Sequence, residues 1–294
     1  MRVLHFGDIH FWKIGTDRDF LYLKRLLGII NLTVRRSRRF PPEYARVVAQ
    51  EVARQEADLV IFSGDFTTMS LNSEFRMAAE AFAPICEKFG DRLFAIPGNH
   101  DRYTPYSVRS GRLEKLLPFA SLGDEGQLTR TQVVSDQLAL VGFDCSHPCR
   151  VRSNGTMDDA LVEELRVALE NQREAGRRVF LVGHYPFAYP PEVEIAWEHK
   201  LLGMERLEEL VAEFKPAGYF HGHKHIRWQL RSPGAPATPC LNCGAAGMKS
   251  ASEEKQAGFL VADFADDDLE LRSLDAHVLS ADARSFRVTP MSVV

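Results

Sequence analysis

Short apolar runs that end at a polar residue recur along most of the chain. Each has several consecutive apolar residues followed by a turn such as Gly-Asp, Pro-Gly or Gly-His. Runs of this length, bounded by turn residues, predict strands that are buried on both faces. They cover residues 2–8, 57–65, 92–101, 137–144, 177–186 and 216–225.

Between several of these runs the apolar residues return every three or four positions, which predicts helices. The helical stretches are residues 41–57, 74–89, 157–175 and 203–215. Alternating strands and helices predict the α/β class, with helices covering the outer faces of the sheet. Residues 258–277 alternate more like antiparallel strands, and no fixed-period repeat or low-complexity linker interrupts the chain. We therefore expect one compact domain over residues 1–294.

Composition adds constraints on the class of protein. An apolar content of 45% and a charged content of 26% are typical of a soluble globular protein. With a net charge of −4, the chain lacks the overall positive charge that is typical of nucleic-acid-binding proteins, so we expect no nucleic-acid partner. The first residues lack the pattern of a signal peptide, no apolar run reaches about 18 residues, and the five cysteines are an odd number. These features favour a reduced, cytoplasmic protein.

Carboxylate, amide and imidazole side chains follow the predicted strands. They are Asp8, His10, Asp65, Asn99, His100, His184, His223 and His225. If their segments are extended, residues two positions apart point the same way, so each Asp-x-His or His-x-His pair would face one centre. Carboxylate, amide oxygen and imidazole together suit Mn, Fe or Zn better than Mg or Ca. With His100 set aside, seven ligands are too many for one ion and suit two.

The blocks "GDIH", "SGDF", "GNHD", "GHYP" and "GHKH" span residues 8–225, and in this order they resemble the calcineurin-like metallophosphoesterases. The resemblance implies a four-layer αββα sandwich with two mixed β-sheets and two divalent metal ions, Mn first and Fe or Zn as alternatives. It implies that Asp65 bridges the ions. The first ion would be held by Asp8, His10, Asp65 and His225, and the second by Asp65, Asn99, His184 and His223.

The same resemblance implies a phosphoesterase that cleaves a phosphodiester or diphosphate bond. A hydroxide bridging the two ions would attack phosphorus, and His100 would be the catalytic histidine that supplies a proton to the leaving oxygen. Asp101 either orients the His100 ring or is a solvated loop carboxylate. Arg102, Tyr103 and Tyr185 flank the blocks and are candidates for substrate binding.

Residues 20–46 form a basic amphipathic insertion, which could pack on the core or contact an anionic membrane surface or lipid substrate. The second possibility would place the protein peripherally on the inner membrane face. Some bacterial members of the resembled superfamily are UDP-2,3-diacylglucosamine diphosphatases, so a lipid-linked substrate is one expectation. The alternatives are a soluble cyclic-nucleotide or glycerophosphodiester phosphodiesterase and a non-catalytic scaffold on the same fold.

Two further groups of residues have alternative interpretations. Cys145, Cys149, Cys240 and Cys243 could bind a structural zinc ion or could be reduced small residues near the site. His5 lies within the first strand, and we expect it to be buried against a helix.

Overall fold

The structure is a computed structural model, and it describes residues 1–13, 36–124, 126–148 and 152–293. Most of the expected insertion at residues 20–46 lies outside the described residues. Its last part contains the short helix α2 (Ser37–Arg39) and the start of α3 (Pro42–Arg54). None of the helices within the described ranges is both long enough and apolar enough to cross a bilayer.

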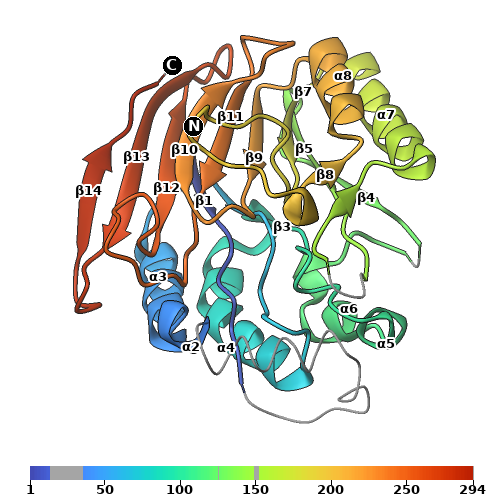
Figure 1. The fold of residues 1–294 in the computed structure, drawn as a ribbon. Helices are drawn as coiled ribbons and strands as arrows, with labels where there is room; N and C mark the ends of the chain where they lie inside the picture. The colour runs from blue at the N-terminus through green and yellow to red at the C-terminus, as the bar shows by residue number, and fades with distance from the viewer. Residues whose placement is uncertain (14–35, 125, 149–151, 294) are drawn as a thin grey trace.

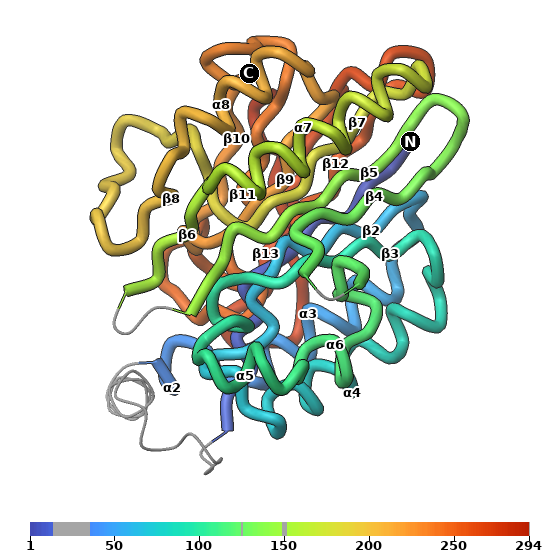
Figure 2. The backbone as a smooth tube through the Cα atoms, turned by 90° about the vertical axis from the view of Figure 1, so that its right-hand side faces the viewer, coloured from blue at the N-terminus to red at the C-terminus, as the bar shows by residue number. Residues whose placement is uncertain are grey.

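Two six-stranded mixed sheets form the centre of the molecule (Figure 1). Strands β1, β2 and β3 are parallel neighbours in the first sheet, while β12 pairs antiparallel with β1 and is followed by β13 and β14. Both ends of the described chain therefore contribute to one sheet (Figure 2). In spatial order the first sheet is β14 (Phe286–Pro290), β13 (Leu271–Leu279), β12 (Gly258–Phe264), β1 (Arg2–Phe6), β2 (Leu59–Phe62) and β3 (Leu93–Ala95).

The second sheet has a parallel centre and antiparallel edges. Strands β5, β7, β9 and β11 are parallel neighbours, and β4 and β10 pair antiparallel at the two edges. Its spatial order is β10 (Arg227–Arg231), β11 (Pro239–Cys243), β9 (Gly218–His221), β7 (Arg178–Val182), β5 (Leu138–Phe143) and β4 (Thr129–Val133). A separate pair is formed by β6 (Gly155–Thr156) and β8 (Leu201–Leu202).

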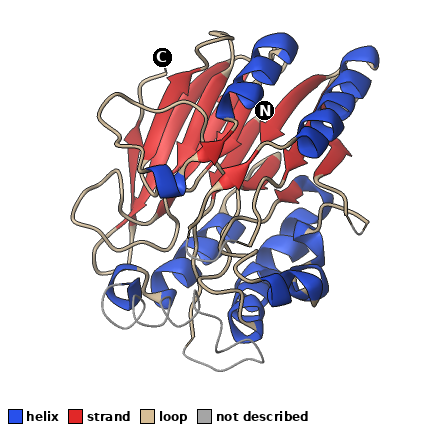
Figure 3. Ribbon diagram, turned by 45° about the vertical axis from the view of Figure 1, so that its right-hand side comes forward, coloured by secondary structure: helices blue, strands red, loops and turns tan. Residues whose placement is uncertain are grey.

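Helices cover the outer face of each sheet (Figure 3). The helices α3 and α4 (Asn72–Phe89) share one apolar cluster with the first sheet, and α7 (Asp159–Glu174) and α8 (Met204–Phe214) share another with the second. A third cluster fills the space between the sheets. This is the four-layer αββα sandwich predicted from the sequence. The shorter elements are α5 (Pro105–Arg109), α6 (Arg112–Leu116), η2 (Gly90–Arg92), η3 (Pro118–Ala120) and η4 (Trp197–His199).

In the central strands successive side chains point alternately to the helices and to the other sheet, so both faces are buried and the sequence is a nearly continuous apolar run. In β1, Leu4 and Phe6 face the helical layer while Val3 faces the opposite sheet. His5 is on the same side as Val3 and lies edge-on to Phe220 of the second sheet, with 5.2 Å between ring centroids. The prediction that His5 is buried is confirmed, but the prediction that it packs against a helix is wrong, because it points between the two sheets.

The six predicted strands and four predicted helices are all present, and the tail forms antiparallel strands. The structure ends most of these strands one to several residues before the polar blocks. The blocks therefore lie in the loops that follow the strands, at an edge where loops from both sheets meet.

Candidate metal centre

The loops after β1 and β2 run side by side and bring three ionisable residues together. The backbone N–H of Asp8 donates to the Gly64 carbonyl at 2.9 Å, and the N–H of His10 donates to the Asp65 carbonyl at 3.1 Å. Asp8, His10 and Asp65 have φ angles of 52°, 51° and 64°. The expectation of an extended Asp-x-His segment is therefore wrong: these residues have left-handed backbone, which is uncommon outside glycine and concentrates at functional sites.

The loop after β9 approaches the same place from the second sheet. His223 and His225 also have positive φ, 73° and 57°, and the His223 N–H donates to Asp8 Oδ2 at 2.8 Å. A Cβ atom on Gly222 would lie 2.3 Å from that same oxygen. Glycine is thus required there by the close approach of the Asp8 carboxylate rather than by an unusual φ.

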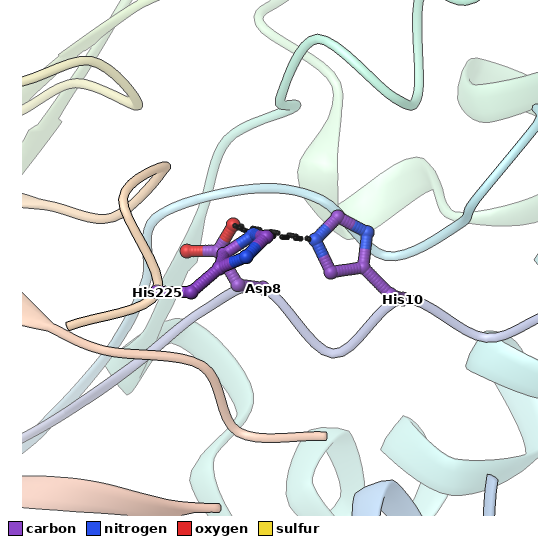
Figure 4. A group of neighbouring side chains, drawn as sticks. All are labelled: Asp8, His10 and His225. Carbon is purple, nitrogen blue, oxygen red and sulfur yellow. Dashed lines mark hydrogen bonds and ion pairs between the residues drawn. The ribbon is translucent and has the colours of Figure 1, made fainter. Parts of the chain in front are cut away.

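A first cluster gathers around the Asp8 carboxylate (Figure 4). Asp8 Oδ1 lies 3.5 Å from His10 Nε2 and 3.1 Å from His225 Nε2, and these two nitrogens are 2.9 Å apart. Asp65 Oδ2 lies 3.6 Å from His10 Nε2. The four side chains can therefore offer one atom each to a single cation.

A second cluster lies on the other side of Asp65. Asp65 Oδ2 is 3.3 Å from His184 Nε2, which is 3.1 Å from Asn99 Oδ1. His223 Nδ1 completes the group at 3.0 Å from Asn99 Oδ1 and 3.3 Å from His184 Nε2. Asp65 Oδ2 is therefore close to both clusters, and both can share it.

Carbonyl groups fix the tautomers of three of these histidines. His10 Nδ1 lies 3.2 Å from the Thr67 carbonyl, His184 Nδ1 lies 2.8 Å from that of Ser63, and His223 Nε2 lies 2.9 Å from that of His199. A carbonyl can only accept, so each of these nitrogens carries the proton. The other ring nitrogen then directs its lone pair into a cluster, as metal-binding imidazoles do.

The donor set fits two divalent cations. Asp8 Oδ1 is buried and accepts no hydrogen bond. When the His184 ring is neutral, as a metal ligand must be, its Nε2 and Asn99 Oδ1 are both acceptors, yet they face each other at 3.1 Å. Buried acceptors that face one another are costly unless a positive charge lies between them. The mixture of carboxylate, amide oxygen and imidazole matches ions such as Mn, Fe or Zn.

The electrostatics favour the protonation states that metal ligands need. Burial alone would raise the pKa of Asp8, but His225 and His10 beside it hold that pKa well below its usual range. Burial, followed by the Arg36 guanidinium, lowers the pKa of His10 to about 4. Burial and the neighbouring His184 also lower the pKa of His223. Ionised carboxylates and neutral His10 and His223 are therefore the stable forms at neutral pH. Burial also lowers the pKa of His184, but the Asp65 carboxylate outweighs it and raises that pKa, so His184 must lose a proton to bind a metal.

His100 occupies a different position from the other histidines. Its Nδ1 donates to the Thr68 carbonyl at 2.6 Å, so its Nε2 is an acceptor. That nitrogen is close enough to Asp65 and His10 to share a cation with them, but here it accepts from the Arg36 guanidinium. Burial and that guanidinium lower the pKa of His100.

The structure does not support substrate binding by Arg102. Its guanidinium donates to Asp144 at 2.9 Å and to Glu114 at 2.6 Å. The side chain is 13% exposed and does not line the cavity beside the two clusters. Its positive charge is already balanced by two carboxylates, which disfavours contact with a phosphate, and substrate binding by Arg102 stays a prediction.

Neither predicted tyrosine lines the cavity. The Tyr103 ring stacks on His100 at 5.7 Å between centroids, and the Tyr185 ring lies 4.2 Å from His223. Tyr185 is fully buried, and its hydroxyl donates to the Ser153 carbonyl at 2.7 Å. Each ring packs against a histidine of the site, and substrate contact by Tyr103 or Tyr185 stays a prediction.

Asp101 has neither of the two roles expected from the sequence. It is 2% exposed, and its oxygens accept from the N–H groups of Phe66, Thr67 and Gly98 and from the Thr67 hydroxyl. Its carboxylate therefore joins the loops that follow β2 and β3 and does not contact the His100 ring. Burial, together with the charge of Asp65, raises the pKa of Asp101 to about 7.

A cavity of about 390 Å³ opens over the two clusters. Its remaining wall is polar and basic, and the sequence motifs contain only one of these residues, Lys224. Beyond the cluster residues and His100, it is lined by Arg36, Arg39, Phe40, Ser153, His199 and Lys224.

The cysteines do not form one metal site in the described part of the chain. Cys240 belongs to the apolar cluster under α7 and α8, whereas Cys243 belongs to the cluster between the sheets. The two side chains therefore lie on opposite faces of β11 and cannot share an ion. Burial raises the pKa values of both thiols. Cys149 lies outside the described residues.

Comparison with known proteins agrees with this geometry. The family described as calcineurin-like phosphoesterase matches residues 1–227 of the chain. No curated protein matches the sequence. The fold and the match together define a metal-dependent hydrolase of phosphoric esters. The chain belongs to the calcineurin-like phosphoesterase family, as its motifs suggested.

Solved structures share the fold at low identity. A dimetal phosphatase from Danio rerio has a TM-score of 0.61 at 13% identity, covering 99% of each chain. The structure of PhoD has a TM-score of 0.61 at 10% identity, covering 99% of this chain and 68% of the other. A 5'-nucleotidase from Candida albicans has a TM-score of 0.50 at 16% identity, covering 96% and 52%.

Proposed function

We propose that the protein hydrolyses a phosphodiester or diphosphate bond with two divalent metal ions bound at the paired clusters. The observation that carries this proposal is the position of Asp65 Oδ2, which lies 3.6 Å from His10 Nε2 and 3.3 Å from His184 Nε2. One ion would be held by Asp8, His10, Asp65 and His225. The other would be held by Asp65, Asn99, His184 and His223.

Two bound cations would supply a water of lowered pKa and would stabilise negative charge on the phosphoryl oxygens. The chain itself would contribute the proton for the leaving oxygen. His100 is suited to this because the Thr68 carbonyl fixes its Nδ1–H and leaves Nε2 facing the cavity. In this role Nε2 would first take up a proton from solvent and would then give it to the ester oxygen as its bond to phosphorus breaks.

Manganese is the ion we expect first, with Fe or Zn as alternatives, because the two ligand sets together combine four imidazoles with two carboxylates and an amide oxygen. The Danio rerio phosphatase and the Candida albicans nucleotidase are, by their names, enzymes that act on phosphate groups. Their likeness to this chain supports the fold, and the family match supports the reaction class.

The identity of the group joined to the phosphate that is cleaved, an alcohol or a second phosphate, is a finer proposal. A lipid-linked diphosphate such as UDP-2,3-diacylglucosamine would use the basic insertion at residues 20–46, of which Arg36, Arg39 and Phe40 line the cavity. A soluble cyclic-nucleotide or glycerophosphodiester substrate would need only the polar cavity. Sedimentation with anionic phosphatidylglycerol vesicles separates the two, because a lipid substrate predicts binding and a soluble one does not.

Hydrolysis of bis(p-nitrophenyl) phosphate by the Mn-loaded protein tests the proposed reaction. We expect release of p-nitrophenol by the wild type and none by Asp65→Ala. A panel of phosphomonoesters, cyclic nucleotides and nucleotide diphosphate sugars then identifies the bond that is cleaved. If the wild type binds two ions but leaves every ester and diphosphate intact, the proposal is wrong.

A further inference from the structure

The Arg36 guanidinium lies inside the cavity, between two histidines of the site. Its Nη1 and Nη2 atoms are 3.2 and 3.1 Å from His100 Nε2, and Nη2 is 3.1 Å from His10 Nδ1. The residue immediately precedes α2, and its guanidinium carbon is 5.4 Å from the Phe40 ring centroid. Arg36 is thus the cation that lies deepest in this cavity among the described residues.

This guanidinium has donors that the protein does not use. Its Nε atom is buried and has no hydrogen-bond partner. Within the described ranges, no carboxylate forms an ion pair with it, and its other contacts are to neutral imidazole nitrogens. A buried charge without a counter-charge is costly, so its position favours an anion as the missing partner.

Two bound cations would make the binding of an anion in the cavity more favourable. They would bring four positive charges beside Arg36, against the two negative charges of Asp8 and Asp65. Among the described residues, the cavity wall adds no acidic side chain other than Asp65. With both ions in place, Arg36 would therefore remain in this position only if an anionic group entered the cavity.

The chemistry of the two partners identifies that group. Both terminal nitrogens of Arg36 converge on one acceptor, His100 Nε2, which is the geometry of a fork that grips an oxygen anion. His100 Nε2 is also the atom that would give a proton to a leaving oxygen. An ester of phosphoric acid offers both an anionic oxygen for the fork and a bridging oxygen for the imidazole.

We propose that Arg36 is a substrate-binding residue: it holds a nonbridging oxygen of the phosphoryl group and thereby places the ester oxygen against His100 Nε2. This inference rests on the proposed function. Once the phosphoryl oxygen replaces His100 Nε2 as the acceptor of Arg36, that nitrogen can take up a proton from solvent. As a hydroxide oxygen bonds to phosphorus and the ester bond breaks, this proton moves to the leaving oxygen and His100 returns to its neutral form. Arg36 keeps its own protons and stabilises the charge on the phosphoryl group.

Binding of inorganic phosphate to the Mn-loaded protein tests this role without requiring turnover. Arg36→Gln removes the charge, Arg36→Lys keeps the charge but loses the fork, and Arg38→Gln is a matched control on the exposed side of α2. Calorimetry should show phosphate affinity weakened about 10- to 100-fold by Arg36→Gln, and less by Arg36→Lys. Arg38→Gln should bind phosphate like the wild type. Every variant should retain two ions by elemental analysis.

A kinetic comparison separates substrate placement from a structural role. With Arg36→Gln, kcat/KM should fall more for esters of poor leaving groups than for p-nitrophenyl esters, because misplacement of the ester oxygen matters most where proton transfer is needed. Wild-type phosphate affinity in both Arg36 variants would overturn the proposal, as would loss of the metal ions from both. If instead the wild type binds neither ions nor phosphate, the proposed function fails, and this inference falls with it.

Discussion

Replacing Asp65 by asparagine removes one negative charge and changes the side-chain volume very little. Asp65 Oδ1 accepts a hydrogen bond from the backbone N–H of His100 at 2.8 Å, and an asparagine oxygen can accept the same bond. The other oxygen, Oδ2, is the atom near both clusters. An amide nitrogen in that place could not ligate a cation, so both proposed ions would lose a ligand while the loop kept its shape.

The magnitude follows from electrostatics. Two unit charges about 4 Å apart attract by about 4 kcal/mol at an effective dielectric constant of about 20. Since about 1.4 kcal/mol corresponds to a factor of ten and the attraction to a divalent ion is larger than that between unit charges, loss of the carboxylate charge should weaken metal binding by at least about 1,000-fold. Neighbouring imidazoles hold the pKa of Asp65 well below its usual range, so the carboxylate is ionised at neutral pH and its charge is fully lost in the variant.

Elemental analysis after dialysis against a metal buffer measures this effect. The wild type should retain two ions per chain, and Asp65→Asn should retain fewer than one. Asp144→Asn is a matched control, because Asp144 is also a buried aspartate after a central strand but pairs with Arg102 instead. Asp144→Asn should retain both ions. Full retention of two ions and of esterase activity by Asp65→Asn would refute the shared-carboxylate assignment.

Three further predictions concern protons and loop stability. Burial lowers the pKa of His184, but the Asp65 carboxylate at 3.3 Å outweighs it and raises that pKa to about 9. Metal binding below that pH should therefore release about one proton, and the affinity for metal should rise with pH up to about 9. If the calorimetric enthalpy of metal binding is the same in buffers of different ionisation enthalpy, no proton is released and this prediction is wrong. His100→Asn should retain both ions yet lose about 100- to 10,000-fold in kcat, with the smallest loss on p-nitrophenyl esters; equal losses on all esters would exclude a proton donor. Asp101→Ala should lower the free energy of unfolding by about 3 kcal/mol, since several buried N–H donors lose their acceptor, and an unchanged urea midpoint would disprove that bracing role.

The strands and helices were predictable because their patterns are strongly periodic. A run such as residues 57–62 can be buried only between two layers, and α7 repeats its apolar residues at helical spacing. The edge strands β4 and β10 were not predicted, because half of their side chains are exposed or polar and the apolar run is broken. The pairing of the two sheets came from the family resemblance and not from the residue pattern.

The convergence of the eight motif residues on one place could be expected from strand ends, but the way they converge could not. Left-handed backbone at Asp8 and His10 depends on hydrogen bonds to the neighbouring loop, which a local pattern does not contain. Arg36 was missed because it lies in a basic stretch where no spacing distinguishes it from its neighbours. The ion pair of Arg102 with Asp144 could not be expected either, because the two residues are distant in sequence.

The ligands of each proposed ion come from both sheets. Loops after β1, β2 and β3 supply Asp8, His10, Asp65 and Asn99, while loops after β7 and β9 supply His184, His223 and His225. Cations held there would act as reversible cross-links between the facing layers. Free ion at about 100 times its dissociation constant would add about 2.7 kcal/mol per site to the free energy of unfolding. The melting temperature of the protein would then report the concentration of free divalent metal around it.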